Sequence, residues 1–111
     1  MWDKGILQEL MTKFCHDMAG AINITGNGVE LAQSLSDPNA MAEALSIAQK
    51  GSEKSYATLR LFRDIIFAEN LPDMDAAKEI LADYAKCYGV ESQLDFDNNE
   101  LKEQAIKLVI G

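Results

Sequence analysis

The chain has 111 residues, of which 48% are hydrophobic and 25% are charged. This balance is typical of a folded domain with a core and excludes a disordered chain. Eighteen acidic and ten basic residues give a net charge of −8, which repels nucleic acid and anionic membrane surfaces. We therefore expect neither nucleic acid nor a membrane among the direct partners.

The uncharged stretches are too short and too polar to cross a bilayer, the longest being 18–29 and 31–36. The first residues also lack the pattern of a secretion signal, so we expect a cytoplasmic protein. Cys15 and Cys87 belong to no CxxC pattern. They are expected to be reduced thiols, and no metal site is predicted.

Two long helices are predicted in the first part of the chain. From Ile6 to Leu35, apolar residues recur at three- and four-residue spacing, which is typical of an amphipathic helix. Asp37 and Pro38 end this helix and match the N-cap and first position of the next one. The second helix is expected to continue to about Glu69, where a proline-containing segment stops it.

Two long helices with a tight connection predict an antiparallel hairpin over residues 1–71. A lone hairpin cannot cover the apolar stripes of both helices, so we expect it to dimerise into a four-helix bundle. Gly26 and Gly28 interrupt the first helix. Because the helical period resumes after them, we expect a close packing contact, a bend or a local weakness there rather than a turn.

The sequence pattern changes at residue 72, and residues 72–111 are expected to form a small or truncated α+β segment. The predicted elements are a helix over 75–88 capped by Asp75 and ended by Gly89, a strand over 90–97, and a last helix, capped by Asn98 or Asn99, through Ile110. The whole chain is therefore predicted to be mainly α.

The chain contains one histidine, His16. A helical wheel places it away from the apolar stripe, on the solvent face, and the small Ala19 and Gly20 one turn along leave the ring accessible. An exposed imidazole is a competent nucleophile near neutral pH. The neighbouring Asp17 could fix its tautomer or accept its second proton. From the residues alone, both side chains could equally be ordinary polar residues of a helix surface.

A resemblance to a known family favours chemistry. The stretch CHDMAGAINITGNGVELA, with His-Asp and then Asn-Gly-x-Glu-Leu beginning eleven residues after the histidine, resembles the ChpT-type histidine phosphotransferases of bacterial two-component phosphorelays. Residues 57–67, ATLRLFRDIIF, are similar to the end of the second helix in that family. Two positions depart from the pattern: Ala21 stands where a proline is usual, and Gly20 where phosphatase-competent kinases carry Thr or Asn.

The resemblance implies that His16 accepts a phosphoryl group from the aspartyl phosphate of one receiver domain and passes it to another. Asp17 would orient or deprotonate the ring. The docking surface for response-regulator receiver domains would include Ala19, Gly20, Asn23 and Asn27. The resemblance also implies a homodimer, and a second domain over 72–111 that is similar to a degenerate kinase ATP-binding domain.

No cofactor is expected in the protein itself. The sequence has no glycine-rich phosphate loop and no other nucleotide-binding motif, so ATP is not an expected ligand, and the Mg²⁺ of the reaction would be held by the receiver. The alternative hypothesis is a non-catalytic helical dimerisation or scaffold module. It keeps the hairpin and treats His16 and Asp17 as surface residues.

Overall fold

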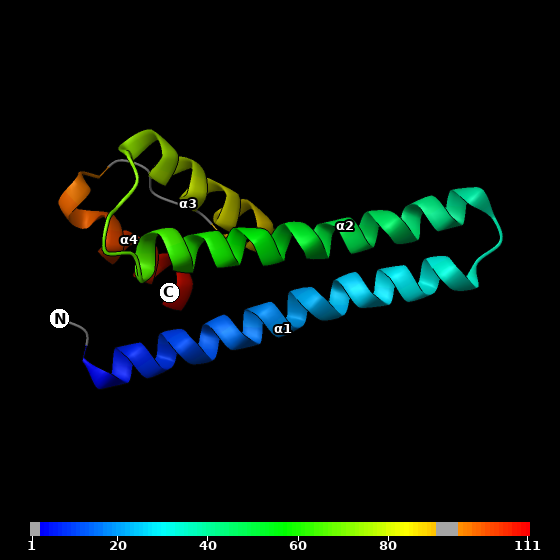
Figure 1. The fold of residues 1–111 in the computed structure, drawn as a ribbon, viewed down its shortest axis with the longest axis horizontal. Coiled ribbons are helices and arrows are strands. Elements are labelled where there is room, and N and C mark those ends of the chain that lie inside the picture. The colour runs from blue at the N-terminus through cyan, green and yellow to red at the C-terminus, as the bar shows by residue number, and fades with distance from the viewer. Residues whose placement is uncertain (1–2, 91–95) are drawn as a thin grey trace.

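The computed structural model describes residues 3–90 and 96–111. Figure 1 shows its main feature, a long antiparallel hairpin of two helices. The helices are α1 (Lys4–Ser34), α2 (Pro38–Leu61), α3 (Met74–Tyr88) and α4 (Leu101–Ile110), with a π-helical turn at Phe62–Ile66 and a 3₁₀ turn at Asn98–Glu100. The described part of the chain is mainly helical and contains no strand. The predicted strand over 90–97 falls chiefly on residues 91–95, which lie outside the described residues.

Aspartates cap both helices of the hairpin. The Asp3 carboxylate accepts a hydrogen bond from the Ile6 amide at 2.9 Å, and the Asp37 carboxylate accepts one from the Ala40 amide at 3.1 Å. Pro38 occupies the first turn of α2, where its missing N–H costs nothing. The predicted cap and break between the two helices are therefore confirmed.

The two later caps differ from the prediction by one or two residues. Asp73, not Asp75, caps α3 by accepting from the Ala76 amide at 2.8 Å. Asp75 lies in the first turn, where its charge favours the helix dipole without closing the cap. Gly89 ends α3 with a φ of 64°, as predicted.

The last helical segment begins with a capping box that the prediction missed. Asp97 accepts from the Asn99 amide at 3.0 Å, and the Glu100 side chain accepts from the Asp97 amide at 3.3 Å. This reciprocal pair satisfies two backbone donors at once, which a single asparagine cap does not. Neither Asn98 nor Asn99 is the cap.

The second helix is shorter than predicted. It passes into the π-helical turn and ends at Phe67, whose amide donates to the Phe62 carbonyl at 2.9 Å. Nζ of Lys102, on α4, donates a hydrogen bond to the carbonyl of Ala68, the residue after Phe67, at 2.7 Å. Lys102 thus gives the Ala68 carbonyl a partner outside the helix, which favours an end of the helix before Glu69.

Glycines set the close approach of α1 to α2. A Cβ added to Gly28 would lie 2.6 Å from the Ala48 backbone nitrogen, and one added to Gly51 would lie 2.6 Å from the Thr25 nitrogen. Gly26 is different, because a Cβ there would meet nothing within 4 Å. Of the explanations that the sequence left open, a close packing contact therefore holds for Gly28.

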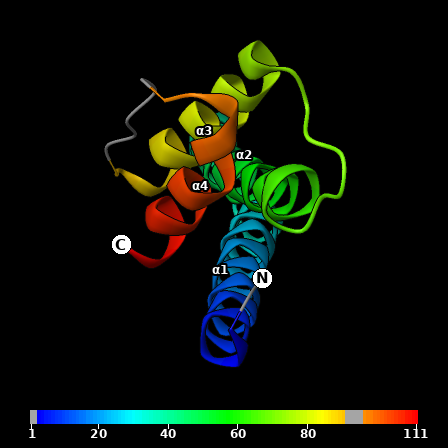
Figure 2. The same ribbon diagram turned by 90° about the vertical axis from the view of Figure 1, so that its left-hand side faces the viewer.

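Helices α3 and α4 pack against one end of the hairpin, where α1 begins and α2 ends (Figures 1 and 2). Tyr84 and Phe62 are the largest fully buried side chains. The core cluster at this end draws on every helix: Leu10, Leu61, Phe62, Ile65, Ile66, Ala77, Ile80, Leu81, Tyr84, Leu101, Ala105 and Val109. The C-terminal segment and the hairpin thus share one hydrophobic core.

The described helices include none with the length and apolar character needed to pass through a membrane.

Gly28→Ala and Gly26→Ala form a matched pair that tests the helix contact. Gly28→Ala should lower the free energy of unfolding by about 1–3 kcal/mol, because the new methyl group meets backbone atoms of α2 that cannot move aside alone. Gly26→Ala should raise it by up to about 1 kcal/mol through helix propensity. Urea unfolding followed by circular dichroism measures both. Equal effects of the two variants would contradict the contact.

Candidate functional site

His16 lies on the exposed face of α1. Its side chain is 82% exposed, as the helical wheel predicted. The predicted docking residues Ala19, Gly20, Asn23 and Asn27 are all exposed on the same helix. A Cβ added to Gly20 would meet nothing within 4 Å, so the surface next to the imidazole is open to a large partner.

Asp17 is buried, unlike its neighbour. Its side chain is only 4% exposed, so the interpretation of Asp17 as an ordinary surface residue is wrong. The physical reason is its place on the helix, about 100° from His16 and on the side of α1 that faces α2, where Ala21 and Gly28 are also buried. A buried carboxylate requires partners, and Asp17 has three.

The two oxygens of the Asp17 carboxylate have different partners. Oδ2 accepts a hydrogen bond from the Tyr84 hydroxyl of α3 at 3.1 Å. Oδ1 lies 3.2 Å from Nζ of Lys13 and 3.5 Å from Nδ1 of His16. The carboxylate therefore joins a buried tyrosine on one side to the exposed imidazole on the other.

Burial raises the pKa of Tyr84, and the Asp17 carboxylate raises it further. The hydroxyl consequently stays protonated and acts as a hydrogen-bond donor to the carboxylate. Lys13 supplies a positive charge next to the same carboxylate, which reduces the cost of keeping it buried. Asp17 can thus remain in the core as an acceptor for a proton on His16.

Tyr88 packs against Tyr84 and makes a similar contact with a second buried polar side chain, Thr58. Tyr88 lies one turn after Tyr84 on α3, and the two rings stack with centroids 4.6 Å apart. The hydroxyls of Tyr88 and Thr58 lie 2.6 Å apart, and Nζ of Lys54 lies 5.1 Å from the Tyr88 ring centre. Asp17 and Thr58 are the buried polar side chains among the described residues. Both are therefore satisfied by tyrosines of α3.

The arrangement suits nucleophilic chemistry at the imidazole. A carboxylate facing Nδ1 favours the tautomer with a proton on that nitrogen. The lone pair is then on Nε2, which is left for an incoming electrophile. The distance of 3.5 Å between Nδ1 and Oδ1 is long for a hydrogen bond, as is common for catalytic pairs before substrate binds.

Sequence reasoning missed two residues of this site, Lys13 and Tyr84. Lys13 precedes Asp17 by four positions, a spacing that brings helical side chains together and could have identified it. Tyr84 is 67 residues from Asp17, and no local pattern connects them.

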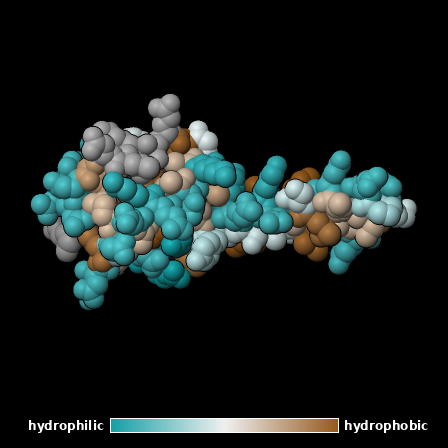
Figure 3. Space-filling view, turned by 90° about the horizontal axis from the view of Figure 1, so that it is seen from above, coloured by the Kyte–Doolittle hydropathy of each residue, from teal (hydrophilic) through white to brown (hydrophobic). Residues whose placement is uncertain are grey.

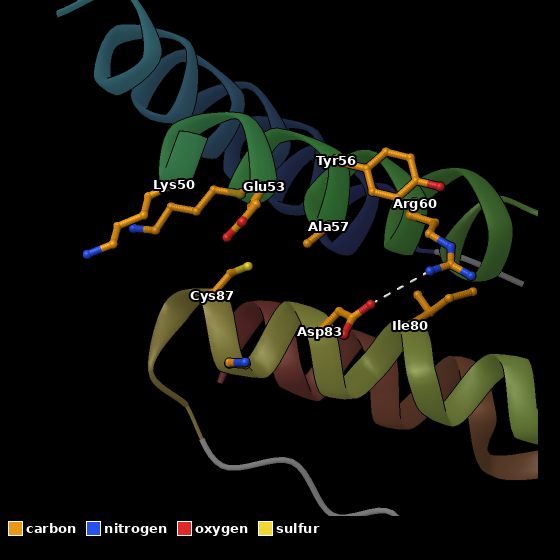
Figure 4. Close-up of a pocket in the computed structure, with 10 residues that line it drawn as sticks. Lys50, Glu53, Tyr56, Ala57, Arg60, Ile80, Asp83 and Cys87 are labelled. Carbon is orange, nitrogen blue, oxygen red and sulfur yellow. Dashed lines mark ion pairs between the residues drawn. The ribbon is translucent and has the colours of Figure 1, made fainter. Parts of the chain in front are cut away.

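A separate groove of about 500 Å³ lies between α2 and α3. Figure 4 shows Lys50, Glu53, Arg60, Asp83 and Cys87 around it. The groove combines both signs of charge, and Nη1 of Arg60 is 3.7 Å from Oδ2 of Asp83. None of its lining residues comes from α1, so it is not part of the His16 site.

No group of three or more His, Cys, Asp or Glu side chains within residues 3–90 and 96–111 is arranged to hold a metal ion.

The hairpin also carries an exposed apolar face. Ile22, for example, is about 140° around α1 from Asp17, which faces α2, so Ile22 points away from the contact between the two helices. Figure 3 shows hydrophobic surface on the part of the hairpin beyond α3 and α4. The exposed residues of this apolar face are Leu7, Met11, Ile22 and Val29 of α1 and Met41, Leu45 and Leu59 of α2.

Comparisons of the chain with protein-family models, curated proteins and solved structures found no match.

The two cysteines should differ in reactivity. Burial, with Glu53 and Asp83 nearby, raises the pKa of Cys87, so its thiolate forms at higher pH than usual, whereas Cys15 is exposed. Near neutral pH, iodoacetamide should modify Cys15 first, and modification of Cys87 should increase as the pH rises. Peptide mass spectrometry over a pH series measures both. Cys87 reacting as fast as Cys15 at neutral pH would contradict this.

Proposed function

We propose that the chain is a histidine phosphotransferase, which carries a phosphoryl group between receiver-domain aspartates of response regulators through a phosphohistidine at His16. The observation that carries the proposal is the pairing of an exposed imidazole with a buried carboxylate at its Nδ1. The sequence resemblance supports the same function.

In the proposed step, Nε2 of His16 attacks the phosphorus of an aspartyl phosphate. A nitrogen–phosphorus bond forms while the bond between phosphorus and the aspartate oxygen breaks, and the aspartate leaves as a carboxylate. The ring gains positive charge, which the Asp17 carboxylate stabilises through the Nδ1 proton. Transfer to the second receiver is the reverse of this step. The receiver would supply the Mg²⁺ and the lysine that neutralise the phosphoryl group.

The exposed surface around His16 fits the approach of a receiver domain. Ala19 and Gly20 leave space beside the ring, and Asn23 and Asn27 offer neutral hydrogen-bonding groups along the next two turns. Because the side chains on the turn after His16 are small, they leave room for an aspartyl phosphate in a receiver site to approach Nε2.

A second copy of the chain is the proposed occupant of the apolar face. Two hairpins packed through these faces would form the four-helix bundle that the sequence predicts. The residues of this face are exposed in the single chain, so α3 and α4 leave the face free. In this arrangement 72–111 supports the hairpin, and the proposal assigns no nucleotide chemistry to it.

Phosphoryl transfer is tested with a receiver domain phosphorylated on its aspartate. The wild-type chain should gain a phosphate that is labile in acid and stable in base, and His16→Gln should abolish it because the nucleophile is lost. Cys15→Ser, a change at the adjacent exposed residue, should retain it. Labelling that persists in His16→Gln would contradict the proposal.

The exposed apolar face also supports the alternative function, a dimerisation module without chemistry. The two functions differ in whether His16 and Asp17 take part in chemistry. If His16→Ala leaves partner-dependent signalling intact in cells, the module is favoured; if signalling stops while the chain stays folded and dimeric, phosphotransfer is favoured.

Dimerisation is tested with a charge placed on the apolar face. Wild-type chain should have twice the mass of one chain by light scattering, and Ile22→Glu should reduce it to that of a monomer because two carboxylates would be buried in the interface. Ile22 is 58% exposed, so the fold of one chain should tolerate the change. The control is Leu31→Glu, at a residue that is 46% exposed on the side of α1 that carries Asp17. A wild-type monomer, or equal effects of both variants, would contradict the interface.

A further inference from the structure

Tyr84 takes no part in the bond making and bond breaking of the proposed reaction. We propose, on the basis of the phosphotransfer function above, that Tyr84 is a positioning residue for His16. Its hydroxyl holds the Asp17 carboxylate in the orientation that directs Oδ1 to Nδ1 of His16, and so selects Nε2 as the phosphoryl acceptor.

The Asp17 carboxylate needs such a partner because its side-chain torsion angles alone do not determine its orientation. Rotation of an aspartate carboxylate about its last side-chain bond is only weakly restricted. In this protein the hydrogen bond from Tyr84 to Oδ2 holds one oxygen, and the plane of the group then places Oδ1 beside Nδ1 of His16. Oδ1 also lies 3.2 Å from Nζ of Lys13, so without the hydroxyl the carboxylate is free to keep this ion pair while it turns away from the imidazole.

Lys13 restricts the orientation of the Asp17 carboxylate less than Tyr84 does. Its side chain is 41% exposed and belongs to the same helix as Asp17, so holding it in one place costs side-chain entropy. The Tyr84 side chain is fixed by the core, being 2% exposed and stacked on Tyr88. Lys13 therefore offsets charge, whereas Tyr84 determines geometry.

The contact also makes the site dependent on α3. His16, Asp17 and Lys13 belong to α1, and the one group that fixes the carboxylate comes from a different helix. The hairpin alone supplies the nucleophile, and α3 supplies its orientation. Packing of α3 against the hairpin thus completes the acceptor site.

The tautomer of His16 tests this proposal without any receiver domain. Nitrogen-15 NMR of the full chain, at a pH of about 8.5 where imidazole is neutral, distinguishes a proton on Nδ1 from one on Nε2. Because the chain has one histidine, its ring resonances need no assignment. Wild-type protein should carry the proton mainly on Nδ1, facing Asp17.

Tyr84→Phe keeps the buried ring and removes only the hydroxyl. It should shift the proton toward Nε2, the tautomer that a free histidine side chain favours, and Asp17→Asn should do the same. Tyr88→Phe is the matched control, since it removes the neighbouring hydroxyl that contacts Thr58 and not Asp17. It should leave the wild-type tautomer unchanged.

Phosphotransfer rates give a second readout. Tyr84→Phe should slow labelling by a receiver by at least about tenfold, the effect of losing one hydrogen bond to a charged group, while Tyr88→Phe should not. A wild-type ring protonated on Nε2, no tautomer change in Tyr84→Phe, or an equal change in Tyr88→Phe would overturn the positioning role. If the tautomers behave as expected but His16 is never phosphorylated, the positioning role stands and the proposed function fails.

Discussion

The hydrogen bond between Tyr84 and Asp17 is the interaction on which the rest of the structure depends. A carboxylate that leaves water must be paired and hydrogen-bonded, or it destabilises the fold. Here the requirement ties α3 to α1 at a single point within the core. It also brings a charged group to within 3.5 Å of the imidazole while keeping it away from solvent. The hydrogen bond from Tyr84 to Asp17 therefore contributes both to the stability of the fold and to the organisation of the candidate site.

The hairpin is held together by different forces along its length. At the end near His16, large side chains such as Phe62 and Tyr84 fill a core to which every helix contributes. Toward the α1–α2 connection, small residues allow the two backbones to touch, as at Gly28 against Ala48. The large apolar side chains of the second part point outward, as Ile22 and Leu45 do. The part of the hairpin near His16 thus buries its large side chains within one chain, and the other part leaves its large apolar groups exposed.

Local patterns were sufficient to predict the hairpin, since the apolar period, the Asp37 cap and the exposure of His16 depend on residues close in sequence. The predictions were weaker where two neighbouring aspartates compete for one cap, as Asp73 and Asp75 do. They failed for Asp17, because a carboxylate is rarely buried without partners and its hydrogen-bond donor comes from a distant helix. The contact with Tyr84 spans 67 residues, and a single sequence contains no periodicity over that separation. The exposure of His16 was therefore predictable, and the buried hydrogen bond beside it was not.

The π-helical turn at Phe62–Ile66 bears on how such a site changes in evolution. Turns of this kind correspond to one extra residue inserted into an α-helix. A π-helical turn holds the extra residue within about one turn of the helix, so deleting one residue there would restore α-helical winding and leave the exit direction of α2 nearly unchanged. The start of α3 would then stay on the same side of the hairpin, and Tyr84 would keep its place beside Asp17. Deleting one residue from the α-helical part of α2 would instead rotate everything after it by about 100°. The turn at Phe62–Ile66 is therefore a place where the length of the chain can change while the buried carboxylate keeps its partner.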